Sequence, residues 1–219
     1  MSYTCFLHRP ITCNLGSLIG RTYRLASSSV PSSGPDYYRL FPKTFPRGAP
    51  PSSPFMIEDR KLRKEYRKLQ ALNHPDLINR LNQNGGSEVT HTSSSLINKA
   101  YDTINDPLKR SQYLLNLNAN IDLTSDEATH KYEFADQDTL MRILEIHENL
   151  EEMTNQKEAE KFRRENQIRI NESIEKLDIL YSKKDYEAIA METIRLKYWY
   201  NIKNVLKDWL PGKPINLTH

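Results

Sequence analysis

Apolar side chains recur at helical spacing in the first half of the chain. Between residues 56 and 73 they form one stripe of an amphipathic helix, made of Leu62, Tyr66, Leu69 and Leu72. A second helix is expected from about Ser95, with Leu96, Ala100, Tyr101 and Ile104 in its stripe. Asp106-Pro107 should end it and begin a third helix, to about Asn116, because Asp is a favoured N-cap and Pro fits the first helical position.

The second half of the chain lacks the residues that turns between strands require. Residues 108–210, a run of 103, contain neither Pro nor Gly. After a polar break at 118–136, the pattern predicts helices at about 138–153, 156–182 and 186–209, with Asp185 as an N-cap. Short connections between helices favour antiparallel neighbours. The sequence therefore predicts an all-α protein that ends in a three-helix bundle.

Two of these helices carry more apolar surface than one core can bury. In the helix at 138–153, a sufficient core stripe is formed by Ile143, Ile146, Leu150 and Met153. Outside that stripe lie Leu140, Met141 and Leu144. The aromatic run at 198–200 also spreads over too much of its helix. The surplus either packs on the N-terminal domain or forms a docking surface for another protein.

The first 35 residues have a different composition. They contain Arg9, Arg21 and Arg24, ten Ser or Thr, and no Asp or Glu. This composition is typical of a mitochondrial transit peptide, and the alternative is a disordered tail. Removal of residues 1–35 would lower the formal net charge from +3 to 0 and remove Cys5 and Cys13. A mature chain without cysteine cannot hold an iron–sulfur cluster by thiolates.

The helix at 56–73 is strongly basic and ends at an unusual tripeptide. Its cations are Arg60, Lys61, Arg63, Lys64, Arg67 and Lys68, against two nearby acids, Asp59 and Glu65. Such a face suggests an acidic partner, although a merely solvated face is the alternative. His74-Pro75-Asp76 follows directly, and its proline should end the helix in a stiff corner. No further metal ligands at suitable spacing and no paired nucleophile accompany it.

Three motifs in order resemble a J-domain over residues 36–117. They are the basic helix ending in His74-Pro75-Asp76, then Asn98-x-Ala100-Tyr101, then Asp106-Pro107-x-x-Arg110-x-x-Tyr113, with Tyr37-Tyr38 in a first short helix. The resemblance implies a co-chaperone that stimulates the ATPase of a DnaK-type chaperone. It assigns chaperone binding to Arg60, Arg63, Lys64, Arg67, Lys68 and His74-Pro75-Asp76. The chain itself has no Gly-rich phosphate loop, so no enzyme activity is expected.

The C-terminal half extends this resemblance to the HscB-type J-proteins of iron–sulfur cluster biogenesis. The similar segments are Leu196-Lys197-Tyr198-Trp199-Tyr200-Asn201 and Asp208-Trp209-x-Pro211-Gly212-Lys213, while the segment 40–46 is similar to the fungal mitochondrial branch. The resemblance implies a two-domain, L-shaped arrangement with a linker at 118–136 and a bundle at 137–219. It also implies that the bundle binds the cluster scaffold protein through Leu140, Met141, Leu144 and Tyr198.

The expected protein is a monomer of the mitochondrial matrix without cofactor, bound metal or membrane insertion. Its two partners would be the chaperone and the scaffold. One alternative is a J-protein of another mitochondrial process, such as protein import, with a different client. A nucleic-acid binder that uses the basic helix is a second alternative, but a mature charge of 0 and the lack of recognition motifs argue against it. His130 and His147 form no spaced ligand set with Asp136, which argues against a metalloenzyme.

Overall fold

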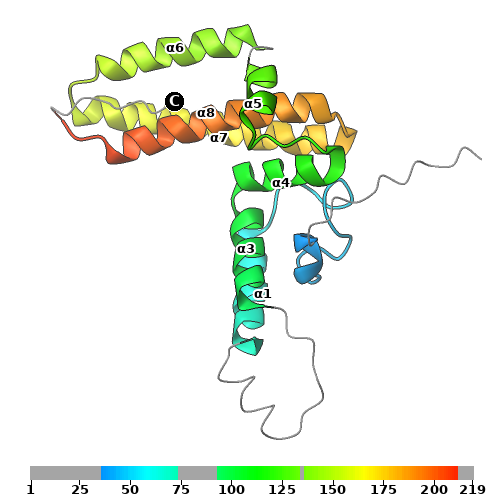
Figure 1. Cartoon of the computed structure of the whole chain (residues 1–219). Helices are drawn as coiled ribbons and strands as arrows, with labels where there is room; N and C mark the ends of the chain where they lie inside the picture. The colour runs from blue at the N-terminus through cyan, green and yellow to red at the C-terminus, as the bar shows by residue number, and fades with distance from the viewer. Residues whose placement is uncertain (1–35, 74–92, 134–135, 212–219) are drawn as a thin grey trace, which may run out of the picture. The chain divides into compact units, whose positions relative to one another are not determined.

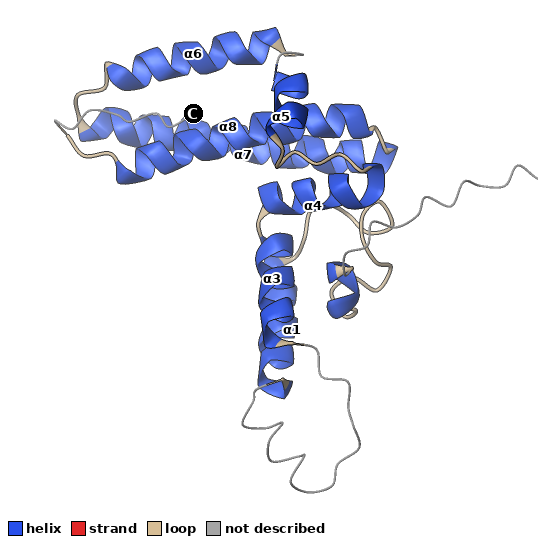
Figure 2. Cartoon of the chain, in the orientation of Figure 1, coloured by secondary structure: helices blue, strands red, loops and turns tan. Residues whose placement is uncertain are grey.

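The structure is a computed structural model, and it describes residues 36–73, 93–133 and 136–211. In these ranges every regular element is a helix and no strand occurs (Figure 2). The prediction of an all-α protein is therefore confirmed. Within the described ranges, none of the helices combines the length and the apolar content that crossing a membrane requires.

In the described residues before Asn120, the structure has a short 3-10 helix and three α-helices (Figure 1). The elements are η1 (Tyr37–Leu40), α1 (Asp59–Leu72), α3 (Ser94–Asn105) and α4 (Pro107–Ala119). As predicted, Asp106 caps α4, because its Oδ1 accepts from the amides of Leu108 at 2.9 Å and Lys109 at 3.0 Å. The expected end at Asn116 was too early, since α4 continues to Ala119 and closes on left-handed Asn120.

Aromatic side chains fix η1 against the helices. The ring of Tyr37 stacks on that of Tyr113 with centroids 4.6 Å apart, and the Tyr37 amide donates to the Tyr113 hydroxyl at 3.1 Å. Tyr38, Phe41 and Leu62 are buried in the same core. Burial raises the pKa of the Tyr38 hydroxyl far above its ordinary value, so this side chain stays neutral.

The segment predicted as a polar break contains a helix. Residues Asp126–Glu133 form α5, inside the interval 118–136 that the sequence pattern left without structure. Two isolated apolar side chains, Leu123 and Tyr132, are buried in the core here. A helix of 8 residues is too short to show the repeated apolar stripe on which the prediction depended.

Three further helices follow, close to their predicted limits. They are α6 (Gln137–Glu151), α7 (Gln156–Lys183) and α8 (Tyr186–Asp208). The predicted N-cap at Asp185 is confirmed, because its Oδ1 accepts from the Ala188 amide at 3.2 Å. Asn155 caps α7 in the same way, with its Oδ1 accepting from the Glu158 amide at 3.0 Å. Polar caps thus divide the Pro- and Gly-free run into separate helices.

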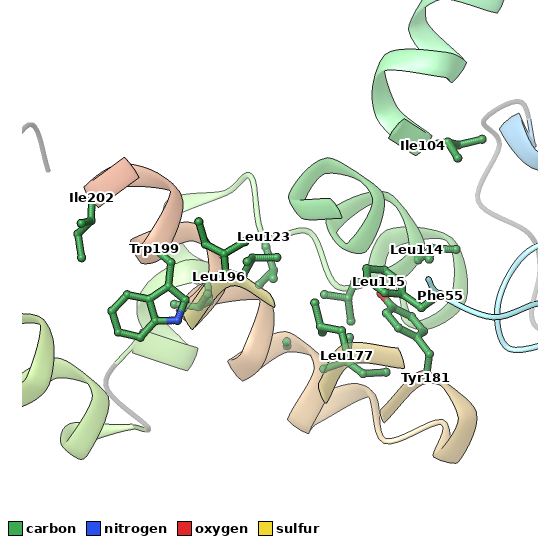
Figure 3. Packing of buried hydrophobic residues seen from close by; sticks show 14 of the residues in the cluster. Phe55, Ile104, Leu114, Leu115, Leu123, Leu177, Tyr181, Leu196, Trp199 and Ile202 are labelled. Atoms are coloured by element: carbon green, nitrogen blue, oxygen red, sulfur yellow. The ribbon is translucent and has the colours of Figure 1, made fainter. Parts of the chain in front are cut away.

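The helices α7 and α8 pack side by side and share a core with α4 (Figure 3). Phe55, just before α1, stacks on Tyr181 of α7 with centroids 4.9 Å apart and an interplanar angle of 8°. Inside the same contact, the Ser111 hydroxyl of α4 lies 2.6 Å from that of Thr193 and 3.0 Å from that of Tyr181. These hydroxyl groups are buried, and their mutual hydrogen bonds offset the cost of removing them from water.

Candidate interaction surfaces

The exposed face of α1 is more cationic than its sequence suggests. All six of its Lys and Arg side chains are exposed, and none forms an ion pair with another described residue. Glu65, one of the two acids counted on this helix, is buried instead. Its carboxylate accepts hydrogen bonds from the amides of Lys43 at 2.9 Å and Thr44 at 2.7 Å, and from the Thr44 hydroxyl at 2.6 Å. It therefore binds a loop of the protein itself.

Replacing Glu65 with glutamine should destabilise the fold by about 1–3 kcal/mol, because an amide group presents one acceptor and one donor to a site built of three donors. Urea unfolding followed by circular dichroism measures the change. Glu58→Gln is the matched control, because Glu58 is exposed and makes no side-chain capping bond. Equal midpoints for the two variants would contradict the role assigned to Glu65.

The other flank of α1 is held on α3, which leaves the cationic face free. The Tyr66 hydroxyl donates to Asn98 Oδ1 at 2.8 Å, and the Tyr66 ring stacks on Tyr101 with centroids 4.0 Å apart. The stripe predicted for α1 is thus partly confirmed, but its last member is not in the core, since Leu72 is 54% exposed. Leu72 is the last residue of α1.

The end of α1 lies where the tripeptide predicted it. Asn73 closes the helix, with both its backbone amide and its side-chain Nδ2 donating to the Leu69 carbonyl, at 3.0 and 2.9 Å. The next residues, His74, Pro75 and Asp76, lie outside the described residues. The chain therefore leaves α1 directly into the motif, at the end of the cationic face.

Arg110, which belongs to the third of the J-domain-like motifs, is buried rather than exposed. Its side chain is buried, with the guanidinium carbon 4.5 Å from the centre of the Phe55 ring. Burial lowers the pKa of this guanidinium, and nearby Tyr38 and Asp59 oppose the shift. Arg110 thus belongs to the packing between α4 and the segment before α1.

The surplus apolar surface of α6 lies open. Ile143, Ile146 and Leu150 are buried, as the core stripe predicted. On the outer side, Met141 is 67% and Leu144 is 55% exposed, while Leu140 is partly buried. These three residues are called the α6 patch below. The expectation that this surface docks another protein stays a prediction.

Tyr198 lies on α8 and is only partly open. It packs against the core, whereas the neighbouring Trp199 is buried in it. Its exposure is therefore smaller than that of Met141 and Leu144. Across the described residues, no cluster of His, Cys, Asp or Glu is arranged to hold a metal ion.

Two domain families match the chain in the order of these surfaces. Residues 54–113 match the DnaJ domain, and residues 135–207 match the HSCB C-terminal oligomerisation domain. The cationic face of α1 lies in the first match and the α6 patch in the second. A J-domain defines a co-chaperone class, and the second match narrows that class to HscB-like members.

Individual relatives agree with the domain matches. The chain is 41% identical over 183 residues to the J-type co-chaperone JAC1, mitochondrial, of Saccharomyces cerevisiae, covering 84% of this chain and 93% of that one. It is 28% identical over 153 residues to the human iron-sulfur cluster co-chaperone protein HscB, covering 70% of this chain and 63% of that one. A solved structure of the Saccharomyces cerevisiae Jac1 co-chaperone aligns with a TM-score of 0.69 and 37% identity, over 84% of this chain and 99% of that chain.

These findings show that the chain belongs to the HscB family of J-type co-chaperones. Its relatives are named as co-chaperones, and four of them are named as mitochondrial or as iron–sulfur cluster co-chaperones. The resemblance that the motifs carried is confirmed at the level of the family.

Proposed function

We propose that this protein is a co-chaperone of iron–sulfur cluster biogenesis in the mitochondrial matrix. It stimulates the ATPase of a DnaK-type chaperone through the cationic face of α1 and His74-Pro75-Asp76. It delivers the cluster scaffold protein to that chaperone through the α6 patch and Tyr198. The observation that carries the proposal is the presence of two exposed surfaces, a cationic one on α1 and an apolar one on α6. Each lies inside one of the two matched domains.

The charges of α1 suit a fast encounter with an acidic partner. Six exposed cations on one helix, none of them paired with a described acid, give a positive field that accelerates association, and salt weakens this effect. His74 and Asp76 follow the end of that helix and would supply polar contacts once the partner is docked. The cations would thus set the rate at which the chaperone associates. The motif would then stimulate ATP hydrolysis by the docked chaperone.

The α6 patch suits the second partner because exposed apolar side chains at the centre of an interface can supply most of the binding energy. A scaffold held there is tethered to the chaperone through the co-chaperone. Tethering raises the effective concentration of the scaffold at the chaperone without any new contact. This is the physical advantage of placing both surfaces on one chain.

A chaperone ATPase assay with and without the cluster scaffold tests the proposed function. We expect this protein to raise the chaperone's rate by itself, and the scaffold to raise it further only when this protein is present. An unrelated mitochondrial client in place of the scaffold is the control. Stimulation that the scaffold leaves unchanged would instead favour a J-protein of another process with a different client.

A further inference from the structure

The first turn of α6 carries no buried apolar anchor. Residues 137–142 are exposed or partly buried, and the first buried side chain of the helix is Ile143. Beneath this turn lies a polar cleft of about 400 Å³ between α6, α7 and α8. The segment that carries Leu140 and Met141 is therefore not held in place by core packing.

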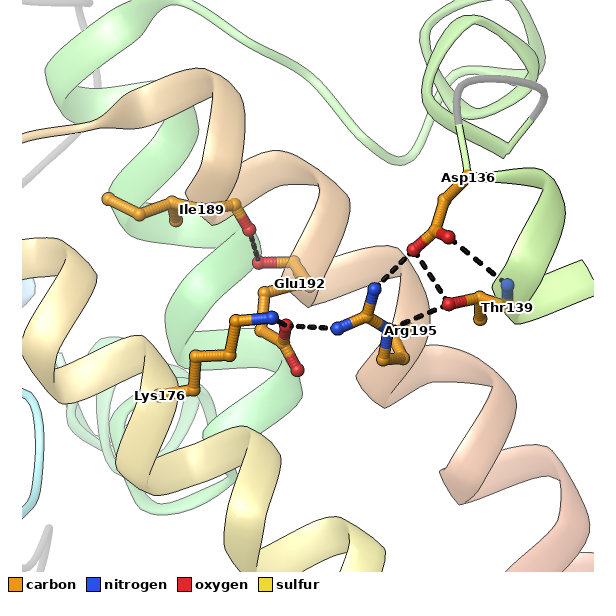
Figure 4. Close-up of polar contacts among 7 residues, drawn as sticks. Asp136, Thr139, Lys176, Ile189, Glu192 and Arg195 are labelled. Atoms are coloured by element: carbon orange, nitrogen blue, oxygen red, sulfur yellow. Dashed lines mark hydrogen bonds and ion pairs between the residues drawn. The ribbon is translucent and has the colours of Figure 1, made fainter. Parts of the chain in front are cut away.

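Arg195 of α8 makes the contacts that hold this turn (Figure 4). Its Nε donates to the Thr139 hydroxyl at 3.0 Å, and its Nη2 is ion-paired with Asp136 Oδ2. Asp136 is the N-cap of α6, with Oδ1 accepting from the Thr139 amide at 3.1 Å. One guanidinium thus binds both the residue that starts the helix and the residue directly before Leu140.

The electrostatics of Asp136 agree with this arrangement. Burial by itself would raise the pKa of this carboxyl, but hydrogen bonds from Thr139 and Arg195 outweigh it, and the pKa lies below its usual range. Asp136 therefore keeps its charge at neutral pH, so the pair with Arg195 persists.

Arg195 is itself oriented from the side of α7 and α8. Its Nη1 donates to Glu192 Oε2 at 2.7 Å, and Lys176 Nζ of α7 lies 2.6 Å from the same oxygen. Glu192 is only 2% exposed, and its charge is matched by two cations. A side chain whose partners are buried loses little additional freedom when it binds a further group. Glu192 thus orients the Arg195 guanidinium, which can then bind the first turn of α6.

We propose that Arg195 is a positioning residue for the α6 patch. By fixing the first turn of α6, it presents Leu140 and Met141 in one geometry before the partner arrives. Preorganisation of this kind increases affinity because less freedom is lost on binding. The inference rests on the proposed function, since it concerns affinity for the cluster scaffold.

Arg195→Met keeps an unbranched aliphatic stem and removes the guanidinium. Calorimetric titration of the full chain with the scaffold should show affinity about tenfold weaker, a typical loss for one preorganising contact. Hydrogen exchange of the amides at 139–141 should accelerate, while ATPase stimulation without scaffold stays unchanged. Wild-type affinity or unchanged exchange in this variant would overturn the inference.

Lys176→Met is the matched control, because it removes the other cation from Glu192 without touching α6. It should change scaffold affinity less than twofold, and a loss equal to that of Arg195→Met would show a general structural effect and overturn the inference. If Arg195→Met does not fold, Asp136→Asn, which retains an oxygen for the cap, should still weaken binding about threefold. Unchanged affinity in that variant would reject the positioning role.

The direct patch variant Leu144→Ser separates the inference from the proposed function. Loss of scaffold binding in Leu144→Ser with normal binding in Arg195→Met would leave the patch in place and remove only the positioning role. Normal binding in Leu144→Ser would show that the proposed docking surface itself is wrong.

Discussion

Replacing His74 with glutamine is expected to return the chaperone's ATPase rate to its unstimulated value. The motif follows directly on α1, which closes on Asn73 by two bonds to the Leu69 carbonyl. Because those bonds do not involve His74, the substitution should leave the helix intact and remove only a polar contact at the docked interface. Steady-state ATP hydrolysis by the chaperone, measured against co-chaperone concentration, gives the result.

Two further measurements make that result specific. His130→Gln is the matched control, since it makes the same chemical change on α5, outside both proposed surfaces, and it should stimulate normally. The His74→Gln protein should also retain its helical circular dichroism and its affinity for the scaffold. Full stimulation by a folded His74→Gln protein would reject the proposed role of the motif.

Substitutions in the α6 patch and at Tyr198 should weaken scaffold binding and leave ATPase stimulation intact, the reverse of what is expected for His74→Gln. Leu140→Ser with Leu144→Ser and Tyr198→Ala is expected to weaken scaffold binding by at least about a hundredfold, because central apolar contacts contribute about 2 kcal/mol or more each. ATPase stimulation in the absence of scaffold should be preserved. Calorimetric titration and the ATPase assay on the same preparations measure both effects.

The control for the patch uses an exposed apolar residue elsewhere in the bundle. Ile168 of α7 is 57% exposed, close to the 55% of Leu144, so Ile168→Ser removes a similar amount of exposed apolar surface. It should bind the scaffold normally. Tyr198 packs on the core, so the Leu140→Ser, Leu144→Ser double variant is measured separately to exclude a folding defect. Undiminished binding by the double variant would show that the scaffold contacts another surface.

Helices were predictable where the sequence has both a long apolar stripe and a polar N-cap residue. The limits of α6, α7 and α8 agree with the pattern to within two residues because each helix combines a long apolar stripe with a polar cap. The short α5 is absent from the prediction because it has no long apolar stripe, although Ser125 caps it, with its Oγ accepting from the Ala128 amide at 3.4 Å. Its burial depends on Leu123 and Tyr132 meeting a core formed by distant parts of the chain.

The two surfaces were predictable from their residues, but their supporting contacts were not. The cations of α1 and the surplus apolar residues of α6 stand out in the sequence because both exceed what a single helix needs. Burial of Glu65 depends on a loop 21 and 22 residues earlier, at Thr44 and Lys43. The pair of Arg195 and Asp136 spans 59 residues, and no local pattern connects them. Such contacts follow only from the packed fold.

The stacked rings of Phe55 and Tyr181 affect how the protein can be divided for experiments. Phe55 is buried against a helix of the C-terminal half, and Ser111 has its hydrogen-bond partners there as well. A fragment cut after residue 117 would expose the apolar ring of Phe55 to water, and water would replace the hydrogen-bond partners of the Ser111 hydroxyl. Such a fragment would be prone to self-association, so its chaperone kinetics would misrepresent those of the intact chain.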